Sequence, residues 1–146
     1  LHGTNIQPSP SKQDFDPDEI DVAASNDRLL TAIAQGDVLT YKHLVDEKVT
    51  CFEPETCGYL VHGTSFHEYY FDRSKRHAPT DPAKHTIVAP SIKIHGDIAV
   101  MAYVRLVQLD GKTSRFEETR IWQRTNKPDA ATSLGRWRLI HFHRSK

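Results

Sequence analysis

The chain has 146 residues, with 19 basic residues, 19 acidic residues and nine histidines, so its formal net charge is zero. This length suits one domain with a real core, and the balanced charge gives no general attraction to nucleic acid or to a membrane surface. Two cysteines, Cys51 and Cys57, are too few for a disulfide framework, and no apolar run approaches membrane-spanning length. We therefore expect a cytoplasmic domain without nucleic-acid or membrane partners.

The N-terminal region is expected to divide into a tail and the start of the domain. Residues 1–15 are polar, contain two prolines and have little to bury, so we predict a flexible tail or linker remnant there and the domain over 16–146. Asp16 can cap a long helix that has Pro17 at its first position and that ends at Gly36.

Shorter elements are predicted between this helix and the second half of the chain. Asp37 can cap a short second helix carrying Tyr41, Leu44 and Val45. A short strand is expected over 49–53, followed by a loop over 54–63. Ser65 and Glu68 have the spacing of a capping box, which predicts a third helix over 66–74.

From residue 85 onward the sequence predicts strands in hairpin order. Gly96-Asp97 and Asp110-Gly111 are hairpin turn signals. The predicted strands cover 85–89, 91–95, 98–109, about 114–124 and 136–144, with Pro90 as a kink and a loop over 125–135. Helices followed by hairpins favour an α+β fold, in which the helices pack on one face of a strongly curved antiparallel sheet. Such a cone has an open mouth suited to a ligand.

Three arginines occur inside three of these predicted strands: Arg105, Arg120 and Arg144. Because side chains alternate along a strand, each shares its face with apolar or aromatic residues: Tyr103 and Val107, then Trp122, then Ile140 and Phe142. A guanidinium cannot be deprotonated, and burying it unpaired is costly. Either buried acids pair with these arginines, or the arginines surround a cavity for an anion. Glu118, two residues from Arg120 on the same face, can simply neutralise it.

Histidines are the remaining candidates for chemistry. His67, in the first turn of the third helix, can serve as a base, as a ligand donor or as a packed side chain. His141 and His143 share a strand face, but two imidazoles do not make a metal site. No HExxH, CxxC, P-loop, dinucleotide or nucleophile motif occurs, so neither a metal nor a cofactor is predicted.

Three motifs together are highly specific: FEPETCGYLVHGTSFHEYYF at 52–71, EETRIWQR at 117–124 and IHFHRSK at 140–146. From about residue 21 the chain resembles the association domain, or hub, of calcium/calmodulin-dependent protein kinase II. The resemblance implies a nuclear-transport-factor-2-like cone and rings of stacked dimers, as dodecamers or tetradecamers. It also implies linkers to kinase domains of a calmodulin-dependent Ser/Thr protein kinase.

The resemblance further implies a pocket for small carboxylates lined by Arg105, Arg120 and Arg144, with His67 at its rim. Glu118 is expected to neutralise part of this cluster. The chain departs from the better-known animal sequences after His67, where it continues as FDRSKRH without the expected tryptophan. Its Asp110-Gly111 turn is shorter and its 125–135 loop is longer, which leaves ligand preference and ring size open.

Two classes of function follow from these observations. The first is a non-catalytic oligomerisation hub, for which Tyr69, Tyr70 and Phe71 are expected to be exposed aromatics at an interface. The alternative is a small lyase, isomerase or hydrolase of the same cone, or a binding protein for acidic metabolites. An enzyme needs an Asp–His pair or a carboxylate deep in the cone with a perturbed pKa, whereas arginines bind anions and make poor bases.

Overall fold

The computed structural model describes residues 16–76, 83–125 and 136–146. The predicted tail over 1–15, and the predicted loop beyond Thr125, lie outside these ranges. In chain order the elements are α1 (Pro17–Gln35), α2 (Val38–Leu44), β1 (Val45–Phe52), the 3-10 helix η1 (Pro54–Thr56), β2 (Val61–His62), α3 (Ser65–Arg76), β3 (Lys84–His95), β4 (Ile98–Leu109), β5 (Lys112–Arg124) and β6 (Trp137–Ser145).

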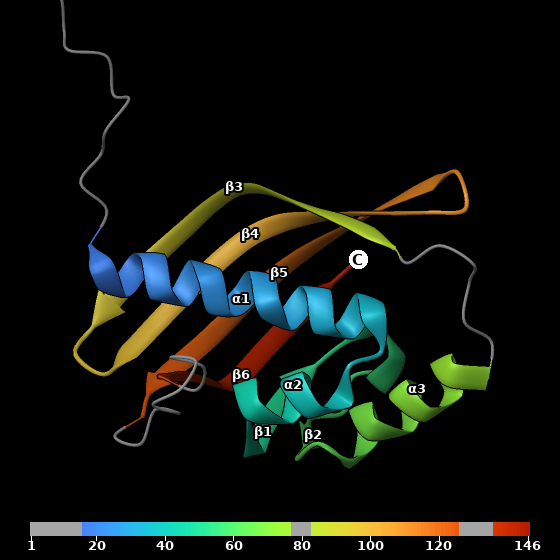
Figure 1. Cartoon of the computed structure of the whole chain (residues 1–146), viewed down its shortest axis with the longest axis horizontal. Coiled ribbons are helices and arrows are strands. Elements are labelled where there is room, and N and C mark those ends of the chain that lie inside the picture. Colours follow the sequence, from blue (N-terminus) through green and yellow to red (C-terminus); the bar gives the residue numbers. More distant parts are fainter. Residues whose placement is uncertain (1–15, 77–82, 126–135) are drawn as a thin grey trace, which may run out of the picture.

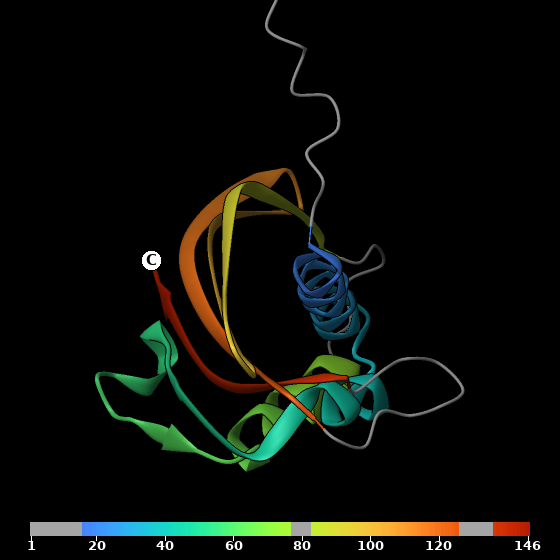
Figure 2. The ribbon, with the colours of Figure 1, turned by 90° about the vertical axis from the view of Figure 1, so that its left-hand side faces the viewer.

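The described strands form one six-stranded sheet in the order β2-β1-β6-β5-β4-β3. The strands bend into an arc, and α1 lies across its concave side (Figures 1 and 2). This arrangement confirms the predicted α+β fold with helices packed on a curved sheet. One pairing differs from the prediction, because β1 runs parallel to β6 while the other neighbours are antiparallel.

Local capping sets the ends of α1 as predicted. The side chain of Asp16 accepts a hydrogen bond from the backbone N–H of Asp18 at 2.9 Å. Gly36 adopts a left-handed conformation, with φ of 70°, and ends the helix. Between these caps, Val22 and Leu29 are buried in the core together with strand residues. None of the helices in the described part of the chain combines the length and apolar character that crossing a membrane requires.

The two predicted hairpins are confirmed. Asp110 and Gly111 both have positive φ, 52° and 75°, as a tight turn between β4 and β5 requires. The other turn, at Gly96, joins β3 to β4. Pro90 does not end β3; instead Ala89 takes a φ of 50° and the pairing with β4 shifts register there, which is the signature of a bulge.

Several helix and strand boundaries differ from the prediction, and the predicted loop over 54–63 contains η1 and β2. Val45 begins β1 rather than closing the second helix, because the strand pairs with β6 from its first residue. Ser65 is the first residue of α3 rather than its cap. The side chain of Glu68, predicted to complete a capping box, forms an ion pair with Lys42 on α2 at 2.6 Å.

Two further predictions were wrong, one about burial and one about the face of a strand. Phe71 is buried in the core, whereas its neighbours Tyr69 and Tyr70 are exposed, because only one side of α3 faces the sheet. In β6, Ile140 has no partner between the Ile121–His141 and Trp122–Leu139 pairs. This bulge interrupts the alternation of side chains along β6. Arg144 shares its face with Phe142 as predicted, but the prediction that Ile140 lies on that face is wrong.

The cap at Gly36 gives a direct test of the α1 boundary. A Cβ at this position meets no atom within 4 Å, so the cost of Gly36→Ala is conformational rather than steric. We expect Gly36→Ala to lower the free energy of unfolding by about 1 kcal/mol. Gly36→Asn is the matched control and should cost less, because asparagine adopts the left-handed conformation more readily. Denaturant melts at one protein concentration measure both; equal losses would contradict the assignment.

Candidate functional site

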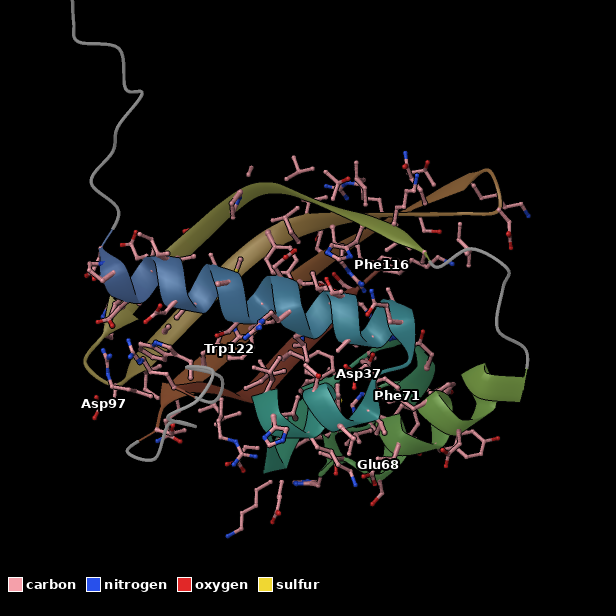
Figure 3. All side chains as sticks on the ribbon, viewed as in Figure 1. Asp37, Glu68, Phe71, Asp97, Phe116 and Trp122 are labelled. Atoms are coloured by element: carbon pink, nitrogen blue, oxygen red, sulfur yellow. The ribbon has the colours of Figure 1, made fainter. Side chains whose placement is uncertain are left out.

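A cavity of about 670 Å³ lies between the helices and the inner face of the sheet. Arg105, Arg120, Arg144 and His67 all line it, so four of the five predicted site residues share one cavity wall. Two other lining residues, Phe116 and Phe71, lie toward the C-terminal end of α1 (Figure 3). Trp122, which is fully buried, lies nearer the N-terminal end of α1 in the same view.

Strand register explains why the charged residues meet. Glu118 of β5 pairs with Tyr103 on β4 and with Arg144 on β6, so these three side chains form one row across the sheet. Arg120 lies two residues along β5 on the same face and pairs with Phe142. The spacing of single residues in three strands therefore builds one polar cluster on the concave face.

Glu118, the fifth predicted residue, is the centre of this cluster. Its carboxylate lies 2.9 Å from Nη2 of Arg105 and 3.4 Å from Nη2 of Arg120. It accepts a hydrogen bond from the Tyr103 hydroxyl at 2.6 Å, and that hydroxyl in turn accepts one from Nε of Arg120 at 2.8 Å. One buried carboxylate thus pairs with two guanidiniums. The sequence had suggested such a pairing with Glu118 for Arg120.

Arg144 is held by a separate pair of acids at the mouth of the cavity. Its Nη2 lies 3.0 Å from Oε2 of Glu53 and also contacts the carboxylate of Glu55. The Glu53 side chain is nearly buried, whereas the Glu55 side chain is 42% exposed. Glu55 is therefore the more easily displaced of the two partners.

An aromatic ring lies close to each of the three guanidiniums. Arg105 and Arg144 both lie over the Phe116 ring, at 5.5 and 4.8 Å from its centroid. Arg120 lies over Phe142 at 4.8 Å. Such cation–π contacts are favourable in a desolvated site and orient the planar fork. A bound anion would therefore meet donors that are already positioned.

His67 lies on the wall of this cavity. Its Nε2 donates a hydrogen bond to Oε1 of Glu53, and its ring packs against those of Tyr41, Phe66 and Phe142. His141 and His143 do not join the site. His141 hydrogen bonds the Thr50 hydroxyl at 2.7 Å, and both imidazoles pack on the Phe52 ring.

Electrostatics keep both buried carboxyl groups ionised. Burial would raise the pKa of Glu118, but the Arg120 and Arg105 charges and the Tyr103 hydrogen bond outweigh it, so that pKa is lowered. Burial opposes ionisation of Glu53 as well. Its hydrogen bond from His67 and its contact with Arg144 nevertheless lower the pKa of Glu53 from 4.5 to about 2.

Sequence reasoning missed the residues that β1 and its following turn supply. Cys51, Glu53 and Glu55 all approach Arg144 or His67, although they are distant from Arg144 along the chain. The available signal was the FEPE motif, in which two acids flank a strand-ending proline. The motif alone did not locate the two glutamates beside Arg144, because the parallel pairing of β1 with β6 is a long-range contact.

The lowered pKa of Glu53 predicts how stability depends on pH. Because folding lowers this pKa, ionised Glu53 stabilises the native state above about pH 4.5, and the contribution is lost as the pH falls through about 2. Glu53→Gln should therefore lower the free energy of unfolding by roughly 3 kcal/mol at neutral pH. The difference in free energy of unfolding between this variant and the unmodified chain should disappear as the pH falls from 4.5 to 2.

Denaturant melts across this pH range, at one protein concentration, measure this difference. Glu117→Gln is the control, because this carboxylate pairs with Arg115 on the exposed surface. A pH-independent difference for Glu53→Gln, or the same profile in both variants, would show that Glu53 is not the stabilising acid.

More distant solved structures bear on the fold alone. A nuclear transport factor 2 (NTF2-like) superfamily protein from Salmonella enterica is 18% identical, with a TM-score of 0.64 over 87% of this chain and 89% of that one. This likeness confirms the expected nuclear-transport-factor-2-like cone and carries no information about activity.

Closer relatives share both sequence and fold. The delta subunit of calcium/calmodulin-dependent protein kinase type II from Oryctolagus cuniculus is 41% identical over 128 residues, which are 82% of this chain and 22% of the relative. The chain thus spans less than a quarter of that protein. The crystal structure of the S. rosetta CaMKII hub is also 41% identical, with a TM-score of 0.70 over 86% of this chain and 94% of that one. The model of the calcium/calmodulin dependent protein kinase II association domain matches residues 18–146, and the chain belongs to this family.

Proposed function

We propose that this chain is an oligomerisation hub that self-associates into a closed ring of dimers and holds kinase domains in one particle. The single observation that carries this proposal is the family match over 18–146, which covers every described element except the first residue of α1. Exposed large apolar side chains agree with it: Leu39, Tyr59 and Tyr69 are 72%, 76% and 61% exposed. Closed rotational symmetry is the usual way to cover such surfaces.

The benefit of such a ring is a high local concentration. Kinase domains tethered to one hub meet one another far more often than free monomers do, so trans-phosphorylation is accelerated without any new contact. Residues 1–15 are proposed as the remnant of the tether, and 16–146 as the self-associating unit.

We further propose that the cavity binds a small carboxylate. Its three arginines are pre-oriented by aromatic rings, and Nε of Arg105 is buried without a hydrogen-bond acceptor among the described residues. Bidentate guanidinium–carboxylate contacts are strong and directional. A ligand would approach Arg144 by replacing Glu55, its more exposed partner.

One observation favours the rival enzymatic function: the His67–Glu53 pair has the geometry of an acid–histidine dyad. Glu53 and Glu118 are not themselves poised as general bases near neutrality, because both are held ionised with lowered pKa values. An ionised carboxylate is also what a histidine base pairs with, so the preference for the hub over a lyase or isomerase rests on the family match.

Particle mass tests the hub directly. Native mass spectrometry of the 146-residue chain should give a closed oligomer of roughly ten or more subunits. A chain that begins at Asp16 should keep the same subunit number, because the polar tail has little to bury. A monodisperse monomer would contradict the hub, and loss of the ring on truncation would show that the tail is a structural arm.

Calorimetry with acetate and citrate tests the carboxylate site. Arg120→Lys keeps the charge but loses the planar fork, so it should weaken binding by about 1–3 kcal/mol. Arg115→Lys, on the exposed face of the same strand, should leave affinity unchanged. Thermal melts of each variant separate weakened binding from damaged folding. Equal affinity in all three chains would make the arginines structural ion pairs.

Glu55→Gln tests the internal competition and should act in the opposite direction. Glu55 occupies Arg144 as a bound carboxylate would, and Gln removes its charge. We expect affinity for acetate to rise by about 1 kcal/mol, on the scale of a partly exposed charged contact. Unchanged or weaker binding would place the ligand away from Arg144.

A further inference from the structure

Three potential metal ligands meet beside the arginine-lined cavity. Cys51 and Glu53 are two residues apart at the end of β1, and His67 approaches them from the first turn of α3. Their ligand atoms, Sγ, a carboxylate oxygen and Nε2, all lie within 4.8 Å of one another. Cys51 takes no part in the proposed binding of a carboxylate by the arginines. The position of its thiol beside Glu53 and His67 therefore needs a separate explanation.

The distances resemble those within a tetrahedral zinc centre. Zinc bond lengths to Cys, His and carboxylate place the sulfur about 3.5 Å from the nitrogen and oxygen ligands, and those two about 3.3 Å apart. Here Sγ of Cys51 lies 3.8 Å from Nε2 of His67 and 3.6 Å from Oε1 of Glu53. The His67 and Glu53 atoms are 2.5 Å apart and need to separate by less than about 1 Å.

The surroundings hold each ligand in place. Arg144 takes Oε2 of Glu53, which leaves Oε1 toward the other two ligands. The imidazole of His67 is fixed by rings on three sides, and Cys51 is 1% exposed on a core strand. Contacts of this kind around the ligands orient them before the metal arrives. Glu53 and His67 also line the cavity, so a water molecule can reach a fourth position.

A nucleophilic role for the Cys51–His67 pair is a weaker explanation. Burial, reinforced by the neighbouring Glu53 charge, raises the pKa of the Cys51 thiol to about 12. The thiol is therefore protonated at neutral pH and is a poor nucleophile. A bound divalent cation can still ionise this thiol, because it stabilises the coordinated thiolate and displaces the proton to solvent.

We propose that Cys51, Glu53 and His67 form a binding site for zinc or a similar borderline-soft divalent cation, with a cavity water as the fourth ligand. Metal binding replaces the His67–Glu53 hydrogen bond with two bonds to the ion. The imidazole then binds the ion as its Nδ1–H tautomer, so the Nε2 proton passes to Nδ1 by exchange with solvent, and the Cys51 thiol proton is released. The positive charges of Arg120 and Arg144 lie beside the cluster and repel the metal ion. The site therefore binds metal reversibly rather than as a structural zinc.

Cobalt is the probe for this site, because a tetrahedral Co²⁺–thiolate centre absorbs strongly whereas Zn²⁺ is silent. The full chain, stripped with chelator under reducing conditions, is titrated with cobalt chloride, and zinc chloride is then added to displace it. Cys51→Ser and His67→Gln remove one ligand each. Cys57→Ser is the matched control, because this second thiol is exposed and follows in the next turn.

The proposal expects a sulfur-to-cobalt charge-transfer band in the unmodified chain and in Cys57→Ser, and its loss in Cys51→Ser. His67→Gln should weaken cobalt binding at least about tenfold. No band at excess cobalt, or a band that disappears in Cys57→Ser but persists in Cys51→Ser, would overturn the assignment.

X-ray absorption of the zinc-loaded Cys57→Ser chain gives a second test that leaves all three ligands intact. One sulfur per zinc at about 2.3 Å, with nitrogen and oxygen ligands at about 2.0–2.2 Å, supports the site. A shell of nitrogen and oxygen alone would overturn it, since Cys51 is then not a ligand.

Discussion

The structure depends on one buried carboxylate, that of Glu118. Its side chain has no exposed surface, and it lies between two guanidiniums that the sheet carries into the interior. Without this acid, Arg105 and Arg120 would place two uncompensated charges beside the core, which is among the most costly arrangements in a folded protein. With it, the two guanidiniums share one negative charge, and the concave face can carry them.

The same balance extends across the cavity and links its parts. Arg144 is matched by Glu53 and Glu55, so three arginines face three carboxylates on this wall. An anion that enters must exchange with a partner already in place, and the most exposed acid offers the easiest exchange. Glu53 connects this pocket to the Cys51–His67 cluster, since its two oxygens face the two sites. Occupation of either proposed site would therefore change the environment of the other.

Sequence reasoning succeeded where the cause is local. Asp16 and Gly36 set the first helix, Asp110-Gly111 sets a hairpin, and alternation along β4 and β5 placed Arg105 and Arg120 on the inner face. It failed where the cause is a distant strand. The parallel pairing of β1 with β6 brings Glu53 to Arg144, across 91 residues of sequence, and no local pattern records it. The bulge at Ile140 was missed for the same reason, because it appears only in the register with β5.

The central claim is that Glu118 is present to neutralise the buried arginines, and a double-mutant comparison tests it most directly. Thermal and denaturant melts, at one protein concentration, would compare Glu118→Gln with the double variant Glu118→Gln/Arg105→Met. The account predicts that Glu118→Gln alone costs about 3–5 kcal/mol, because it leaves buried positive charge unpaired. Removing one arginine as well should restore a substantial part of that loss. A double variant that is less stable than Glu118→Gln would show that the two residues do not compensate each other, and would contradict the account.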